Sequence, residues 1–514
     1  MESTKRRPPP LTHSRSIGTV VGRSGFGDGA VGGDAAEPVS PAGLLFRQRR
    51  FDCYIVAALG IGVPIDVDAV KSGLVSTLVR HPRFSSVLVA GDDSGEKLKW
   101  VRTKVVIDDH VVVPDLGADS SGEGIGGSAS SADKVVEDYV SNLSAAPPMD
   151  ASRPLWELHV LNLRTSEAAA VAVFRIHHSL GDGLSLISLL LACTRRTADP
   201  TSLPTLPQPR LPLPPPPRSN ALLNAILFLW ALIVLTWNTA ADLFDLLASS
   251  AWLKDTPTPL KGGAGTELRR KRFVHRTLRL DDVKEIKDSM NCTINDVLVG
   301  VTSASISRYL NRRYGEADEG NDSKKELPAN IRLRSAMLFN VRPQLGIQAL
   351  AEMMDGKNCG VAWGNLLSYI ILPFPVIMYN DPLDYVRAGK AIAERKKNSL
   401  QAILTYRCAH FCVRKFGIKP GVAMIRGLVS NTTLSYSNIV GPVDEVSFYG
   451  HPIVYIAPSV YGHPHALTLH YQSYINEMRV VLGVDESTIP DSHQLLADIV
   501  ESVKLIKEAL PKKL

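Results

Sequence analysis

The sequence predicts a mixed α/β protein with two domains, and three observations carry that prediction. Short apolar runs rich in β-branched residues, such as Tyr54 to Ile61, alternate with longer segments whose apolar residues recur at helical spacing. A proline-dense run, residues 204–218, divides the chain and is predicted to be an extended linker. The 514 residues are enough for more than one hydrophobic core.

The composition excludes several classes of protein. Residues 1–40 are rich in Gly, Ser and Pro and hold no apolar run, so we expect a disordered tail without a secretory signal. The net charge of +6 is scattered, without the dense basic clusters of a nucleic-acid-binding protein. The six cysteines form no CxxC pair and are expected to be reduced thiols in a cytosol-facing protein.

The first domain is predicted to span residues 41–201. It begins with the strand Tyr54 to Ile61, and a helix capped by Asp66 or Asp68 follows. Alternating apolar residues predict further strands in RHPRFSSVLV, KWVRTKVVIDDHVVVPDL and RPLWELHVLNL. Two intervening segments are predicted to be a Gly/Ser loop and a helix, at residues 117–132 and 135–143.

The most informative stretch of the domain is HHSLGDG, residues 177–183. An apolar strand precedes it, a glycine-containing turn lies within it, and an apolar helix capped by Asp182 follows. Successive residues of a strand face opposite ways, so His177 and His178 cannot both face one cleft. This argues against a metal site made by the two histidines. It favours one working base beside one structural neighbour.

Residues 202–265 are predicted to be the proline-rich linker followed by an apolar helix at about 221–237. The segment ALLNAILFLWALIVLT, with its flanks, approaches the roughly 20 residues that span a bilayer. Three alternatives are open: a transmembrane helix, a helix lying in the membrane interface, and a buried helix. Trp230 and Trp237 suit a membrane boundary. We favour membrane association, with a span ranked slightly above an interfacial anchor.

The second domain is predicted to span residues 266–514. A strand and a short helix lead to a long helix capped by Thr293, in which Asn295 and Asp296 occupy the first turn and complement the helix dipole. Residues 370–378 are expected to be a strand or a surface patch. The domain ends with two antiparallel strands turned at Asn476 and a helix.

HHSLGDG resembles the motif of CoA-dependent acyltransferases, and more narrowly of plant bifunctional wax ester synthase/diacylglycerol acyltransferases. The resemblance extends through PLWE, SYSNIVGP and YGHPHALTLHYQSY and covers most of residues 41–510. It implies a two-domain CoA-dependent acyltransferase fold with an interdomain channel, and an Asn295–Asp296 pair near the cleft. It also implies the endoplasmic reticulum membrane as the location, with the plasma membrane as a second one, and an active site that faces the cytosol.

The resemblance assigns the general base to the second histidine, His178. Making an ester from a thioester requires a base near neutral pH to take the alcohol proton, and a neutral imidazole suits this. Because the thioester is already activated, we expect no metal and no cofactor. Asp182 is expected to hold the turn, and Gly183 to let the backbone pass close by. Backbone N–H groups after the histidines, or Ser437 or Asn438, are candidate oxyanion donors, although a simple turn also explains SNIVGP.

The expected partners are a long-chain acyl-CoA, a fatty alcohol or diacylglycerol as acceptor, and membrane lipid. One alternative is another HHxxxDG acyltransferase that acts on a different alcohol. The plant enzymes for phenolic or alkaloid alcohols also carry a DFGWG motif, which this chain lacks, and peptide condensation domains stand beside carrier modules. The other alternative is a membrane lipid-binding protein without turnover.

Overall fold

The computed structural model describes residues 37–90, 98–116, 129–207, 221–316, 327–341, 346–357 and 363–511. Most of the predicted tail, the predicted linker residues 208–220 and most of the predicted Gly/Ser loop lie outside these ranges. The tail was predicted to end at about residue 40, so residues 37–40 of it lie inside the described ranges. Strand β1 (Glu37–Pro38) pairs with β6 (Lys99–Arg102), and the Glu37 carboxylate also accepts hydrogen bonds from the buried Arg83.

The first of the two large sheets has seven strands. Its order is β10 (Thr194–Arg196), β15 (Val446–Phe448), β16 (His451–Tyr461), β4 (Tyr54–Ile61), β9 (Ala170–His177), β8 (Trp156–Leu161) and β7 (Val111–Val112). Strand β9 is buried at all eight positions, as its apolar sequence predicts. It pairs antiparallel with β8.

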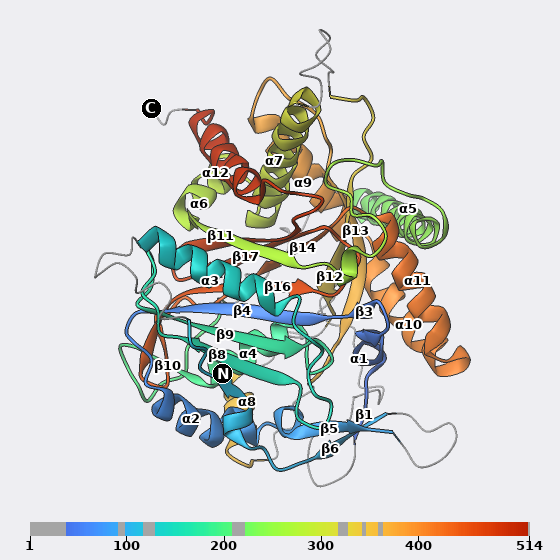
Figure 1. The fold of residues 1–514 in the computed structure, drawn as a ribbon. Helices are drawn as coiled ribbons and strands as arrows, with labels where there is room; N and C mark the ends of the chain where they lie inside the picture. Colours follow the sequence, from blue (N-terminus) through green and yellow to red (C-terminus); the bar gives the residue numbers. More distant parts are fainter. Residues whose placement is uncertain are drawn as a thin grey trace, which may run out of the picture.

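The second large sheet has six strands and lies above the first in Figure 1. Its order is β11 (Lys271–Arg279), β18 (Glu477–Asp485), β17 (Leu467–Tyr474), β14 (Leu434–Ile439), β12 (Arg334–Asn340) and β13 (Leu367–Pro373). Strands β17 and β18 are the two predicted antiparallel strands. Strand β14 contains Ser437 and Asn438, so the expected simple turn at SNIVGP is wrong: its first three residues extend a strand that pairs in parallel with β17.

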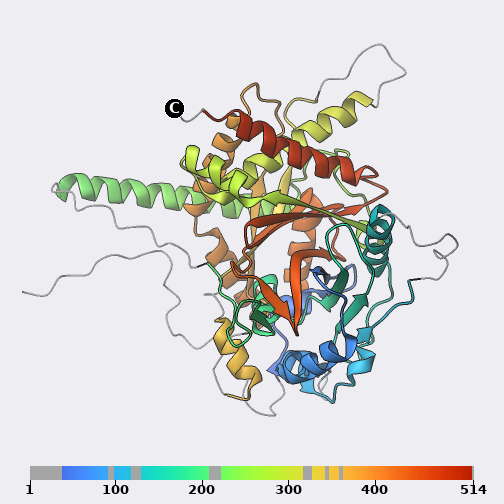
Figure 2. The same ribbon diagram turned by 90° about the vertical axis from the view of Figure 1, so that its left-hand side faces the viewer.

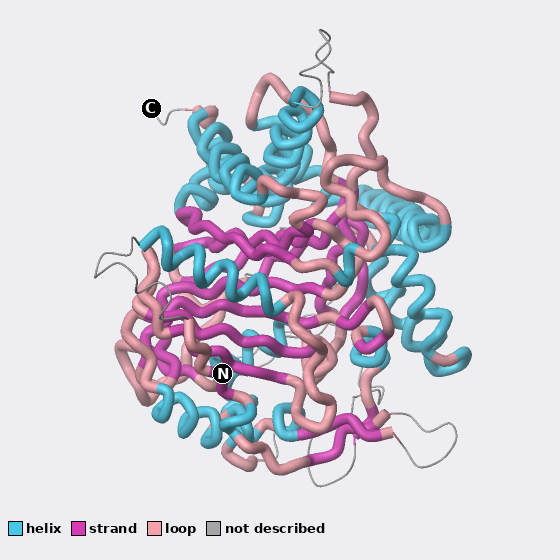
Figure 3. The backbone as a smooth tube through the Cα atoms, viewed as in Figure 1, coloured by secondary structure: helices cyan, strands magenta, loops and turns pink. Residues whose placement is uncertain are grey.

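Four helices cover the outer face of the six-stranded sheet (Figure 1): α6 (Leu280–Ser289), α7 (Ile294–Glu316), α9 (Leu383–Lys397) and α12 (Ser492–Glu508). Helices α7 and α9 pack closely because glycines face each other. A Cβ atom on Gly300 would lie 2.7 Å from the carbonyl oxygen of Tyr385. The two sheets therefore form the centre of the molecule, and most helices lie outside them (Figure 3).

Smaller elements complete the first part of the chain. Helix α2 (Val67–Ser76) begins at Asp66, whose side chain accepts hydrogen bonds from the backbone N–H groups of residues 68 and 69. Helix α3 (Ala129–Leu143) begins earlier than predicted. The first part also contains α1 (Pro41–Leu45), β2 (Arg47–Gln48), β3 (Phe51–Asp52), β5 (Ser86–Val89) and α4 (Gly183–Ala192). Helix α8 (Ile347–Met354) is a short helix of the C-terminal half.

The division of strands between the two sheets does not follow the division of the sequence into two halves. Strands β15 and β16 come from the C-terminal half but join the seven-stranded sheet, where β16 pairs with β4 over most of its length. The chain then enters β17 in the other sheet. Residues 441–461 thus tie the halves together.

Helix α5 (Ala221–Ala251) is longer than the predicted helix and leaves the body of the molecule (Figure 2). Its second half packs against α10 (Gln401–Phe416) and α11 (Ile418–Asn431), with Leu246 buried and Asp242 paired with Lys396. Leu222–Ala251 is the one helix among the described residues that is long and apolar enough to cross a membrane, with a mean hydropathy of 1.8 over an 18-residue window.

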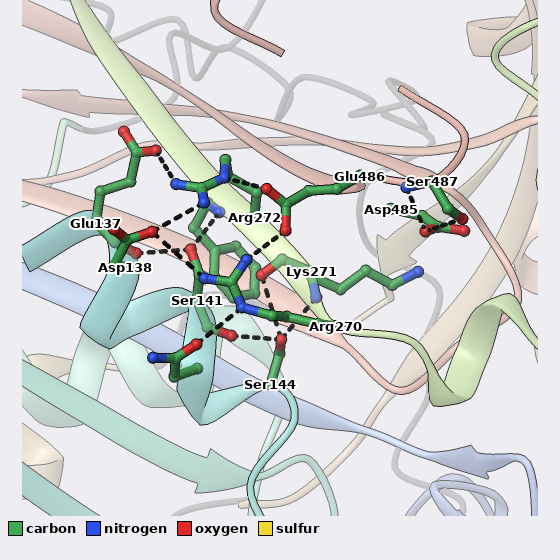
Figure 4. Close-up of polar contacts among 12 residues, drawn as sticks. Glu137, Asp138, Ser141, Ser144, Arg270, Lys271, Arg272, Asp485, Glu486 and Ser487 are labelled. Carbon is green, nitrogen blue, oxygen red and sulfur yellow. Dashed lines mark hydrogen bonds and ion pairs between the residues drawn. The ribbon is translucent and has the colours of Figure 1, made fainter. Parts of the chain in front are cut away.

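A charged contact joins the halves on one side of the molecule (Figure 4). Arg272 of β11 pairs with Glu137 and Asp138 of α3, and with Glu486 after β18. Arg270 also pairs with Asp138 and Glu486. We call these five residues the α3–β11 contact.

Candidate active site

The HHSLGDG segment is the junction between β9 and α4, and Asp182 holds it together. One carboxylate oxygen of Asp182 accepts a hydrogen bond from the backbone N–H of Ser185 at 2.9 Å, which confirms the predicted helix cap. The other accepts the backbone N–H of Leu366 at 3.1 Å. Asp182 is fully buried. Its two oxygens fasten α4 to the segment that precedes β13.

His177 faces away from the cavity between the sheets, and neighbouring side chains engage its ring. Its Nδ1 accepts the backbone N–H of Ser179, so the ring proton is assigned to Nε2, which donates to Asp52 at 3.0 Å. The edge of the ring also meets Tyr54. With both nitrogens engaged, His177 is a structural residue.

His178 faces the opposite way, as the alternation along a strand predicts. Its ring stacks on Phe46, with 3.9 Å between ring centroids, and Nδ1 has no hydrogen-bond partner among the described residues. Burial lowers the pKa of His178 to about 4, against the smaller opposing effects of its own carbonyl and of Asp182. The imidazole is therefore neutral near pH 7.

His178 lines a cavity of about 440 Å³ between the two sheets. This volume lies within the roughly 300–1,000 Å³ usual for small-molecule sites. Apolar side chains form much of the wall on the side of the seven-stranded sheet, among them Leu74, Leu78, Phe84, Phe174, Leu186 and Phe448. The cavity suits a largely apolar ligand with a reacting group at His178.

The six-stranded sheet contributes a polar strip to the same cavity. In the parallel pairing of β14 and β17, Ser437 is opposite His470 and Ile439 is opposite Gln472. Paired residues of neighbouring strands face the same side of a sheet, and all four of these residues line the cavity. We call Ser437, His470 and Gln472 the polar strip.

The other predicted site residues divide between the cavity and the framework. Asn295 and Asn438 line the cavity and are joined by a hydrogen bond of 2.7 Å. Asp296 is not a lining residue: its carboxylate accepts the backbone N–H of Thr293 and pairs with Lys397, so it helps to cap the start of α7. Gly183 lines the cavity but is in ordinary contact with its surroundings. The close approach expected there occurs instead at Gly181, where a Cβ atom would lie 3.1 Å from the Trp363 ring.

The sequence interpretation missed the residues that clamp the histidine turn from outside. Trp363 donates its indole N–H to the carbonyl oxygen of Leu180 at 2.7 Å, and Asn365 donates to that of His178 at 2.9 Å. It also missed His470. The segment WGN, residues 363–365, stands out in the sequence, but the residues that its tryptophan and asparagine contact lie more than 180 positions away, so the sequence does not indicate these contacts. Among the described residues, no three His, Cys, Asp or Glu side chains gather as a metal site would require.

Solved structures with this arrangement define the class. A wax ester synthase/diacylglycerol acyltransferase from Marinobacter aquaeolei VT8 aligns with a TM-score of 0.54 over 92% of this chain and 99% of that one, at 15% identity. The starter condensation domain of rhizomide synthetase RzmA, solved with C8-CoA, aligns with a TM-score of 0.53 over 93% and 96%, at 12% identity. The protein has the mixed α/β, condensation-domain-like fold of CoA-dependent acyltransferases.

Sequence relatives identify the family within that class. The model "Wax ester synthase/diacylglycerol acyltransferase catalytic domain" matches residues 129–298, and "WS/DGAT C-terminal domain" matches residues 363–507. The Arabidopsis thaliana wax ester synthase/diacylglycerol acyltransferases 6 and 5 are 46% and 44% identical to this chain over 93% of it and 94% of their own lengths. The chain belongs to the wax ester synthase/diacylglycerol acyltransferase family, a family of O-acyltransferases.

Proposed function

We propose that this protein transfers a long-chain acyl group from acyl-CoA to a fatty alcohol or diacylglycerol, with His178 as the general base. The observation that carries the proposal is a neutral, buried imidazole inside a largely apolar cavity between the two sheets. Family membership supports the donor and the acceptors, because the relatives are named for wax ester and diacylglycerol chemistry.

The reaction follows from the chemistry of the two groups. A ring nitrogen of His178 takes the proton of the alcohol as its oxygen attacks the thioester carbonyl carbon. The tetrahedral intermediate then expels the CoA thiolate, which receives that proton from His178. The oxyanion formed nearby favours the charged imidazolium, so it raises the proton affinity that burial lowers in the free protein. Acyl-CoA is a substrate here, and the residues of the site perform each proton transfer.

His178 needs support to stay in one orientation, and two contacts provide it. The Phe46 ring covers one face of the imidazole, and Asn365 holds the carbonyl oxygen of His178. Asp182 fixes the turn that follows. A base held in this way loses little entropy on reaching the geometry of attack.

Helix α5 supports a membrane location for the lipid substrates. Its side chains from Leu222 to Trp237 are largely exposed, and Phe228 and Trp230 are 69% and 64% exposed. From Thr239 onward the helix is held by the body of the protein, through Asp242 to Lys396 and Asn431 to Ser249. The projecting part is roughly 24 Å long at about 1.5 Å per residue. This is shorter than the roughly 30 Å of a bilayer core, so insertion from the cytosolic face fits better than a crossing. The endoplasmic reticulum is the proposed membrane.

The function is tested in a host that makes no neutral lipid. The full-length chain is expressed with fatty alcohol, diacylglycerol or neither, and total lipid is analysed. We expect wax ester or triacylglycerol to accumulate only with the matching acceptor. The proposal would be contradicted if no ester formed from either fatty alcohol or diacylglycerol, both in cells and in a purified assay with palmitoyl-CoA.

The membrane role of α5 is tested by flotation with vesicles. Replacement of Phe228, Trp230 and Ile233 by serine should abolish co-flotation, since these side chains are exposed and apolar. Turnover with detergent-dispersed substrates should remain, because none of the three lines the cavity. Flotation of this variant equal to that of the unmodified protein would overturn the assignment.

A further inference from the structure

His470 is a buried histidine that the reaction described above does not use. It lies in β17, it is 8% exposed, and its ring faces the cavity that His178 lines. Neither Nδ1 nor Nε2 of His470 has a hydrogen-bond partner among the described residues. A buried donor and a buried acceptor that are left unpaired each destabilise a folded protein. Such a residue suggests that a ligand completes its hydrogen bonds.

Two other buried histidines in this part of the chain each have a partnered ring nitrogen, although Nδ1 of His465 has no hydrogen-bond partner among the described residues. Nε2 of His463 lies 3.2 Å from the hydroxyl of Thr468, and Nε2 of His465 lies 2.9 Å from that of Thr432. Neither of these two histidines lines the cavity. His470 differs from them because its polar atoms are directed to the space where the substrates react.

The position of His470 relative to the base is also informative. His178 comes from the seven-stranded sheet and His470 from the six-stranded sheet, and both line one cavity. They are near enough that a charge on His178 disfavours a charge on His470. Ser437, opposite His470 in the strand pairing, faces the cavity beside it. A thioester held against His178 would thus present its carbonyl group to the polar strip.

We propose that His470 is a second catalytic residue, whose ring N–H donates a hydrogen bond to the thioester carbonyl oxygen as that oxygen becomes an oxyanion. This inference rests on the proposed acyl transfer. The alcohol C–O–H loses its proton to His178, the new C–O bond forms, and the carbonyl electron pair moves to the oxygen that His470 holds. The pair then returns, the C–S bond breaks, and the proton passes from His178 to sulfur. His470 keeps its own proton throughout.

The electrostatics of the site agree with a donor that stays neutral. Burial lowers the pKa of His470 to about 4, with a smaller effect from His178. A neutral imidazole carries one N–H donor and one acceptor nitrogen. Donors fixed before the reaction stabilise a developing charge more than water does, because they need not reorganise. The Ser437 hydroxyl is placed to assist as a weaker second donor.

The test compares three variants of the full-length enzyme. In His470→Leu the donor is removed and the volume is nearly kept, whereas His470→Gln keeps an N–H group. His275→Gln is the matched control, because His275 lies in the same row of the sheet, two strands away, and does not line the cavity. Each variant is measured for ester formation at saturating palmitoyl-CoA and alcohol, for palmitoyl-CoA binding without alcohol, and for Tm.

We expect His470→Leu to lower kcat by about 10²–10³-fold, the usual loss of one oxyanion donor. Palmitoyl-CoA binding should change less than about threefold, because the oxyanion exists only during reaction. The Tm should equal or exceed that of the unmodified protein, since two unpaired polar atoms are removed. His470→Gln should retain at least about tenfold more activity than His470→Leu, and His275→Gln should turn over normally.

Two results would overturn the assignment. One is a kcat for His470→Leu close to that of the unmodified enzyme. The other is a lower Tm in both His470 variants with equal loss of activity, which a structural role predicts. In either case normal turnover by the unmodified enzyme leaves the proposed function standing. Absence of turnover in the unmodified enzyme would remove both proposals.

Discussion

Two of the regions where the halves of the protein meet differ in their polar chemistry. At the α3–β11 contact, arginines and carboxylates are paired at a partly exposed surface (Figure 4). Across the cavity, the buried polar atoms of His178, His470, Asn438 and Ser459 include several without partners among the described residues. The first region satisfies its own polar groups. The second leaves groups that the substrates can engage.

This difference teaches how one interface serves stability and the other chemistry. Exposed ion pairs contribute little each, but they hold the halves together without occupying the space between them. Unpaired polar atoms in an apolar cavity lower the stability of the protein without substrates. Once a thioester and an alcohol are bound, the same atoms can form hydrogen bonds with the reacting groups. Each region should therefore respond to a different perturbation.

The largest expected effect is from acid, and it acts on the cavity. Burial lowers the folded-state pKa of both His178 and His470 to about 4, below the unfolded value of 6.5. Between these values the unfolded chain binds more protons, so stability falls as pH falls from about 6.5 toward 4. We expect a loss of several kcal/mol in this window, measured by urea unfolding. Constant stability from pH 7 to 4.5 would contradict it.

Next to the α3–β11 contact, protonation of a histidine should raise stability in acid instead of lowering it. Hydrogen bonding to Glu137 raises the pKa of His493, which lies beside Arg272. This histidine contributes stability that is present below its unfolded pKa and is lost as pH rises through the folded one. His493→Gln should therefore slightly steepen the loss of stability in acid. If the dependence of stability on pH were the same in this variant, the His493–Glu137 pair would contribute nothing to stability.

The second effect concerns the framework of the turn. Asp182→Ala removes the acceptor of two backbone N–H groups in a fully buried place and should lower the free energy of unfolding by about 3 kcal/mol. Asp182→Asn keeps one carbonyl acceptor and should lose less. Chemical denaturation of the two variants measures this. A stable but inactive Asp182→Ala protein would instead assign Asp182 to the chemistry.

The smallest effect is expected at the charged region. Arg272→Ala should lower stability by about 1 kcal/mol or less, because the partners are partly exposed and screened by solvent. The loss should diminish in high salt, while kcat remains unchanged because the residue does not line the cavity. Thermal unfolding at low and high salt measures it. A loss of several kcal/mol that does not depend on salt would contradict this prediction and show that the contact is a major source of stability.

Local features were predictable from sequence because they depend on nearby residues. The apolar period gives β4 and β9, Asp182 gives the start of α4, and alternation along the strand separates the two histidines. The fold class and the general base came from the resemblance carried by HHSLGDG.

Long-range features were not predictable from a single sequence. Strand β16 joins β4 across some 400 residues, and Asn365 contacts His178 across 187. His470 is one of three histidines between residues 463 and 470, and sequence does not tell which face of its strand meets a cavity. These contacts depend on how two sheets pack, which no local pattern encodes.

The most direct measurement of the central claim is single-turnover ester formation by His178→Gln. The purified variant is mixed with palmitoyl-CoA and a fatty alcohol, with His275→Gln as the control. We predict a rate lower by about 10²–10⁴-fold, the usual contribution of a general base, with palmitoyl-CoA binding and Tm retained. A rate within about threefold of that of the unmodified enzyme would contradict the assignment of His178 as the base.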